Sequence, residues 1–116
     1  MTSTARRPGK LMPDAQALAD ASMTSEAAFQ VRVVALLKRL GWTVYHTHDS
    51  RRSEVGFPDL ICVRGRRLFA IELKTARGRV TEAQMAWLRA LNEVTQVDAF
   101  ILRPAADWSE FERLVA

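Results

Sequence analysis

The sequence GFPDLICVRGRRLFAIELKTARG, residues 56–78, contains two strand-like runs joined by a short turn. The runs, about Asp59–Val63 and Leu68–Lys74, are rich in β-branched and other apolar residues. Gly65 and Arg66 lie between them, and a glycine at the first central position is typical of a type II′ turn. The stretch therefore predicts a β-hairpin, which fixes where its few polar side chains lie.

The predicted register brings two acidic side chains together. A two-residue turn pairs Val63 with Leu68 and Asp59 with Glu72, and directly opposed residues have Cβ atoms about 4.5–5.5 Å apart. Side chains alternate along a strand, so Lys74 projects from the same face as Glu72, roughly 7 Å further on. We expect Asp59, Glu72 and Lys74 to converge at the open end of the hairpin.

Two ionised carboxylates at this separation repel each other unless one takes a proton or a cation lies between them. Mg²⁺ and Mn²⁺ prefer carboxylate and carbonyl oxygens as ligands. Such an ion can activate water and neutralise charge on a phosphate, and Lys74 could assist. The pattern favours metal-assisted phosphodiester hydrolysis. In the alternative, Glu72 and Lys74 form a solvated pair at a strand end.

The other elements follow from apolar periodicity and capping signals. Ser25 is expected to cap a helix that ends at Gly41, and a capping box of Thr81 and Gln84 opens a second helix. Strands are expected at Trp42–His46 and 97–102, and a last helix at about 107–115. This order predicts an α/β fold with helices on both faces of one sheet.

The chain has 116 residues, of which 48% are hydrophobic, so it suits one compact domain. We expect a polar N-terminal tail at residues 1–23 and the domain at 24–116. The single cysteine, Cys62, excludes an internal disulfide and is expected to be buried. No apolar stretch is long enough to cross a bilayer, which favours a cytoplasmic protein without a membrane partner.

Basic residues are concentrated around the hairpin. The formal net charge is +4, and residues 51–79 hold eight Lys or Arg against three acids. This distribution favours nucleic acid as the partner. The groups expected to contact the DNA backbone are Arg51, Arg52, Ser53, Arg77 and Arg79, although each arginine could equally be a solubility charge.

Two motifs, GFPDL and AIELKTARGRVTEAQMAWLRAL, together resemble the VRR-NUC (virus-type replication-repair nuclease) domain of the PD-(D/E)XK, restriction-endonuclease-like superfamily. The resemblance covers roughly Ser25 to Leu102. It implies a restriction-endonuclease-like core with a mixed sheet of about four strands, flanked by helices on both faces. It also implies a nuclease that depends on Mg²⁺ or Mn²⁺.

Carried onto this sequence, the resemblance implies that Asp59, Glu72 and the Leu73 carbonyl bind the metal, with Glu26 as a further acid. It makes Lys74 the catalytic lysine and Gln84 an active-site polar group, so the expected catalytic set is Asp59, Glu72, Lys74 and Gln84. Similar stand-alone domains imply a homodimer acting on branched or Holliday-junction DNA, with a possible replication or repair helicase partner, in a bacterial or phage-infected cell.

Several alternatives stay open at this point. Glu26 could simply stabilise the first turn of its helix, and Gln30, one turn on, either lines the cleft or is an ordinary surface residue. His46 and His48 could share a strand face and bind zinc, or contact phosphate. The chain could also be a non-cleaving nucleic-acid-binding module that serves as a subunit of a replication or repair complex.

Overall fold

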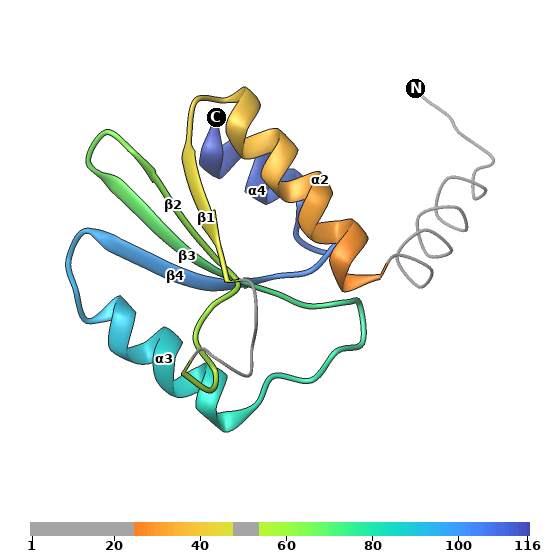
Figure 1. Ribbon diagram of the computed structural model, residues 1–116, viewed down its shortest axis with the longest axis vertical. Coiled ribbons are helices and arrows are strands. Elements are labelled where there is room, and N and C mark those ends of the chain that lie inside the picture. The colour runs from red at the N-terminus through yellow and green to blue at the C-terminus, as the bar shows by residue number, and fades with distance from the viewer. Residues whose placement is uncertain (1–24, 48–53) are drawn as a thin grey trace, which may run out of the picture.

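The computed structural model describes residues 25–47 and 54–116. The predicted tail, His48, Arg51, Arg52 and Ser53 lie outside these ranges. No helix in the described ranges has the length and apolar character needed to cross a membrane. The elements, shown in Figure 1, are α2 (Glu26–Arg39), β1 (Thr43–His46), β2 (Leu60–Arg64), β3 (Arg67–Leu73), α3 (Glu82–Asn92), β4 (Val97–Leu102) and α4 (Trp108–Val115).

The four strands form one mixed sheet in the order β1-β2-β3-β4. The first two pairs are antiparallel, and β4 runs parallel to β3. The hairpin has the predicted register, because Val63 pairs with Leu68 and Ile61 pairs with Ala70. Gly65 has a φ of 62°, the left-handed conformation that the predicted turn requires. The mixed four-stranded α/β sheet is confirmed.

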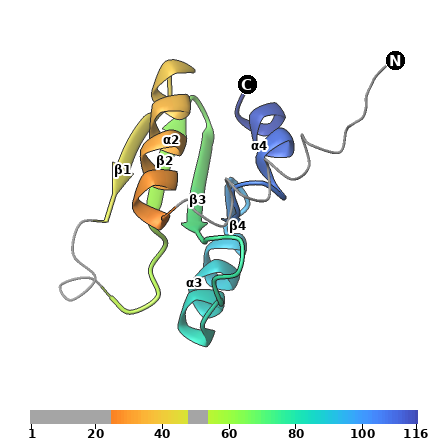
Figure 2. The same cartoon turned by 90° about the vertical axis from the view of Figure 1, so that its right-hand side faces the viewer.

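The helices cover both faces of this sheet, as expected (Figures 1 and 2). Helices α2 and α4 lie on one face, where Phe29, Leu37 and Phe111 pack against β-strand residues such as Ile71. Helix α3 lies on the other face and packs Leu88 onto alanines of β3 and β4. Side chains alternate between the two faces of the sheet, so each strand contributes to two separate apolar layers. Cys62 is buried in the larger layer, as expected.

The predicted caps hold the starts of two helices. The Ser25 hydroxyl accepts a hydrogen bond from the Ala28 N–H at 3.0 Å. Thr81 and Gln84 form the full capping box at the start of α3. The final helix begins at Trp108, and the Asp107 carboxylate accepts from the Arg103 N–H instead of capping the helix. The caps matter because α2 and α3 deliver side chains to the open end of the hairpin.

Two arginines near the turn of the hairpin bind the end of the chain. Arg64 donates to the carbonyls of Leu40, Val115 and Ala116 at 3.0, 3.1 and 2.8 Å. Arg67 donates to the carbonyl of Leu114. These guanidinium groups therefore hydrogen-bond to the C-terminus of α4, where positive charge is favourable. Both arginines belong to the basic stretch that indicated nucleic acid, yet here they stabilise the fold.

Candidate metal centre and active site

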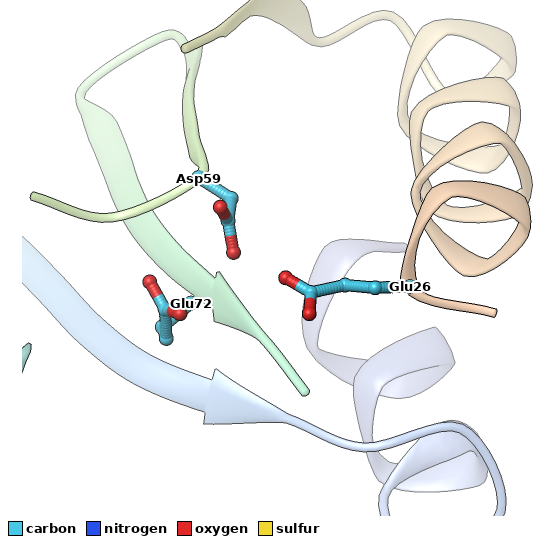
Figure 3. A group of neighbouring side chains, drawn as sticks. All are labelled: Glu26, Asp59 and Glu72. Atoms are coloured by element: carbon cyan, nitrogen blue, oxygen red, sulfur yellow. The ribbon is translucent and has the colours of Figure 1, made fainter. Parts of the chain in front are cut away.

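Three acids from three different elements meet at the open end of the hairpin (Figure 3). Glu26 opens α2, Asp59 immediately precedes β2, and Glu72 lies near the end of β3. One carboxylate oxygen of each lies within 4.8 Å of the others. The side chains of all three point toward a common space in Figure 3. The structure thus brings together the carboxylates that the sequence analysis selected.

The backbone of the hairpin holds Asp59 in place. Its Oδ2 accepts a hydrogen bond from the Leu73 N–H at 2.8 Å, and its carbonyl accepts from the Thr47 N–H at 3.0 Å. Burial raises the pKa of the Asp59 carboxyl, while the Leu73 N–H opposes that rise. The role of the Leu73 carbonyl as a metal ligand stays a prediction.

Glu72 is the most constrained of the three acids, with 2% of its surface exposed. Its Oε2 accepts a hydrogen bond from the Gln84 amide at 2.9 Å and lies 3.7 Å from the Lys74 ammonium. Its Oε1 is buried without a hydrogen-bond partner. A buried carboxylate oxygen in this state is costly, so Oε1 is suited to a cation.

Gln84 connects this carboxylate to the start of α3. Its side-chain oxygen accepts from the Thr81 N–H at 2.9 Å, and its side-chain nitrogen donates to Glu72. The capping role and the active-site position therefore coexist in one residue. Because both ends of the amide are bonded, Gln84 fixes which oxygen of Glu72 is left for another partner.

Burial and the charge of Asp59 raise the pKa values of the other two acids. Burial, followed by the charge of Asp59, raises the pKa of Glu72 to about 8, and Lys74 acts in the opposite direction. Burial and then Asp59 also raise the pKa of Glu26. Protons held in this way are displaced when a cation binds. Three convergent carboxylates, one with a partnerless oxygen, therefore fit a hard divalent cation such as Mg²⁺ or Mn²⁺.

The acids line a cavity of about 610 Å³ that also contacts Thr47, Glu54 and Lys74. One wall is the segment before β2. Gly56 has a φ of 87°, and a Cβ there would lie 2.5 Å from the main chain of Ala83, so this wall sits directly on α3. Phe57 packs edge-on against Trp87 of the same helix. This contact was not predicted from the sequence, where its one signal is the Gly-Phe pair before Pro58.

The family model of the VRR-NUC domain matches residues 13–105. The chain belongs to the VRR-NUC domain family. The resemblance carried by the GFPDL and AIELKTARG motifs is confirmed, and with it a nuclease family. The match begins inside the segment expected to be a tail, so the proposed boundary at residues 23 and 24 stays a prediction.

In structure, this VRR-NUC domain is similar to a Holliday junction resolvase from the archaeal hyperthermophile Archaeoglobus fulgidus. The TM-score is 0.51 at 20% sequence identity, and the similarity covers 66% of this chain and 66% of the resolvase chain. At this identity the likeness supports the expected restriction-endonuclease-like fold. A search of curated proteins finds no match.

The VRR-NUC domain exposes two of the predicted DNA-binding residues. Arg77 and Arg79 lie between β3 and α3, and both are exposed. Arg103 stabilises this segment by donating to the carbonyls of Thr75 and Gly78 at 2.8 and 2.9 Å. The segment that follows Lys74 is therefore held against the end of β4. This role of Arg103 was not predicted from the sequence.

The structure gives a place to one of the two histidines. His46 ends β1 and lines a hollow with Glu26, Gln30 and Thr47. Within residues 25–47 and 54–116, the one group of three neighbouring metal-ligating side chains is the carboxylate trio, without histidine. The geometry of the described residues thus favours an ion bound by oxygen ligands over zinc. Among these residues no further ligand joins His46 to form a zinc site.

Proposed function

We propose that this protein is an endodeoxyribonuclease that depends on Mg²⁺ or Mn²⁺ and hydrolyses DNA phosphodiester bonds. The observation that carries the proposal is the meeting of Glu26, Asp59 and Glu72 beside Lys74, with Glu72 Oε1 buried and unbonded. Oxygens of the three acids, with the Leu73 carbonyl, would hold the ion. A bound ion would supply activated water and charge neutralisation at the phosphate.

The residues of the chain have separable tasks in this reaction. The Lys74 ammonium, only partly exposed beside Glu72, donates to a phosphoryl oxygen or orients the attacking water. Gln84 binds Oε2 of Glu72 and leaves Oε1 for another partner. Exposed Arg77 and Arg79 contact the DNA backbone, together with Arg51, Arg52 and Ser53 of the preceding basic segment.

The substrate is proposed to be branched or junction DNA, bound by a homodimer. Family membership and the fold shared with a Holliday junction resolvase support this choice. A single domain of this size also has little surface with which to grip several duplex arms, and two copies would supply more. A replication or repair helicase as partner, and action in the cytoplasm of a bacterial or phage-infected cell, belong to the same proposal.

Cleavage of supercoiled plasmid and of a four-way junction tests the assignment, with Mg²⁺, Mn²⁺ or EDTA. We expect metal-dependent cutting that disappears in Asp59→Ala and Lys74→Ala while DNA binding survives. Glu112→Ala removes an exposed acid of α4 and is the matched control, expected to cut normally. Binding without cutting under every condition would instead support a non-cleaving module, and equal cutting by both site variants would reject the proposed residues.

A further inference from the structure

The catalytic cavity continues into a groove between α2 and the end of β1. Glu26 and Thr47 line both the 610 Å³ cavity and an adjoining hollow of about 320 Å³. That hollow shares Gln30 and His46 with a third hollow of about 270 Å³, which extends to Lys38. Because each hollow shares lining residues with the next, the three hollows lie in a row that begins at the acids. We call this row the α2–β1 groove.

The lining of the groove changes along its length. Near the acids it is polar, with Gln30 on one side and His46 and Thr47 on the other. Further along, Val31, Val34 and Ala35 give it an apolar wall, and Val31 is 70% exposed. Lys38, which is exposed in the last turn of α2, brings positive charge to its far end. Hydrogen-bonding groups, an apolar wall and a terminal cation match a single nucleic-acid strand.

We propose that the α2–β1 groove binds the nucleotides on one side of the scissile phosphate, as a single strand leaving the catalytic cavity. The proposal deepens the proposed nuclease function and depends on it for the position of that phosphate. Gln30 and His46 contact sugar or base edges next to the cut. The apolar wall packs against bases without reading their sequence, and Lys38 pairs with a phosphate.

The dimensions select a strand over a duplex. The two outer hollows, of about 320 and 270 Å³, are near the lower end of the roughly 300–1,000 Å³ seen for small-ligand pockets, which suits one strand better than paired bases. Glu26 and Lys38 are twelve positions apart on α2, or about 18 Å along the helix axis. At the 3.4 Å rise per nucleotide of a DNA strand, this is about five nucleotides, and fewer if the strand is extended.

Site-directed crosslinking tests the path of the strand. Val31→Cys places a thiol on the apolar wall, and Val94→Cys, 53% exposed beyond α3, is the control. The native Cys62 is buried, and burial raises its pKa to about 11, so it does not compete. The DNA is a duplex with a single-stranded tail that carries a mixed disulfide tethered to one base. Thiol–disulfide exchange then joins protein to DNA and releases the small thiol.

The crosslinking is done in the Lys74→Ala background with Mg²⁺, so that the DNA stays intact. We expect Val31→Cys to react at least about tenfold more than Val94→Cys, and only when the tether lies within about five nucleotides of the branch on one strand polarity. Equal yields from the two cysteines would overturn the proposal. So would a protein–protein disulfide formed by Val31→Cys without DNA, because a second copy would then cover the groove.

A charge reversal gives an independent measurement. Lys38→Glu and Arg39→Glu change the net charge equally on adjacent exposed positions, but only Lys38 lines the groove. We expect Lys38→Glu to raise KM for the tailed substrate roughly three- to tenfold and to lower the salt slope by about one. Arg39→Glu should change KM for tailed and tailless DNA alike.

The two proposals fail separately in these experiments. If Mg²⁺-dependent cutting is retained but KM of Lys38→Glu does not respond to the tail, the groove assignment is wrong and the nuclease remains. If no metal supports cutting by the wild-type protein but Val31→Cys still crosslinks selectively, the groove binds a strand and the nuclease assignment is wrong.

Discussion

The two ends of the β2–β3 hairpin carry ionisable side chains that differ in how well their polar atoms are hydrogen-bonded. At the turn end, Arg64 makes three hydrogen bonds to main-chain carbonyls and lies over the Trp42 ring at 4.8 Å. At the open end, Glu72 keeps one carboxylate oxygen buried without a partner. The same pair of strands thus carries a hydrogen-bonded cation at one end and a carboxyl group with an unsatisfied oxygen at the other.

This difference separates structural charge from functional charge. The Arg64 guanidinium helps to satisfy the C-terminus of α4, and it shares the Val115 carbonyl with the Trp42 indole N–H. At the open end, the charge of Asp59 adds to burial in raising the pKa values of Glu26 and Glu72, so the ionised acids oppose one another there. A charged group with all its partners thus indicates a structural role, whereas a buried polar atom without a partner marks a candidate functional site.

The largest effect is expected from Lys74→Ala, because it removes the only cation beside the carboxylates in the described residues. We expect single-turnover cleavage to fall by about 10²–10³-fold, or about 3–4 kcal/mol of transition-state stabilisation. Thermal stability should change little, since the one ion pair of the ammonium within the described residues is with Glu72, at 3.7 Å. A cleavage rate within about threefold of wild type would place the catalytic cation elsewhere.

The second prediction concerns the turn end, where we expect a substitution to lower stability and to leave cleavage nearly unchanged. Arg64→Ala removes three charge-assisted hydrogen bonds to carbonyls and a contact with Trp42. We expect a loss of about 2–3 kcal/mol in the free energy of unfolding, measured by urea denaturation, with little change in the cleavage rate of the folded protein. Arg66→Ala, at an exposed turn residue, is the control and should be close to neutral.

The third prediction uses the pH dependence of stability without divalent ions. The folded-state pKa of Glu72, about 8, lies above its ordinary value of 4.5. Its protonated form therefore stabilises the fold fully below about pH 4.5, and this contribution is lost as pH rises to about 8. We expect a loss on the order of 2 kcal/mol across that window, seen as a falling Tm in EDTA.

Glu72→Gln should flatten this pH dependence, because the amide does not titrate, and Glu112→Gln on the exposed face of α4 should leave it unchanged. Adding Mg²⁺ to the wild-type protein should raise Tm most at the alkaline end, where the carboxylates are ionised. A Tm of the wild-type protein in EDTA that is highest at about pH 8 would contradict the proposed electrostatics of the open end.

The open end could be predicted from sequence more fully than the turn end, for a physical reason. Gly65 sets a local turn, the turn sets the register, and the register places Asp59 beside Glu72 with no knowledge of the rest of the chain. The capping box of Gln84 is likewise local. The partners of Arg64 lie up to 52 positions away, and only the packing of α4 brings them close.

The same limit explains what else was missed. The contact of Gly56 with Ala83 and the hydrogen bonds of Arg103 to the segment after Lys74 both join elements that are separate in the sequence. The α2–β1 groove depends on how a helix lies over a strand end, which periodicity does not specify. Local signals therefore predicted Asp59, Glu72 and Lys74, the family resemblance added Glu26, and tertiary packing determined the walls of the site and the groove beside it.

The smallest expected effect distinguishes exposed arginines at the two ends. Arg77 lies beside the open end on the segment that Arg103 holds, whereas Arg66 lies at the turn, and both are exposed. If the open end faces DNA, Arg77→Ala should weaken binding and lower the salt slope by about one, and Arg66→Ala should leave the slope unchanged. Fluorescence anisotropy at several salt concentrations measures both slopes. Equal slopes would mean that DNA is attracted by the net charge alone and that the open end does not direct it.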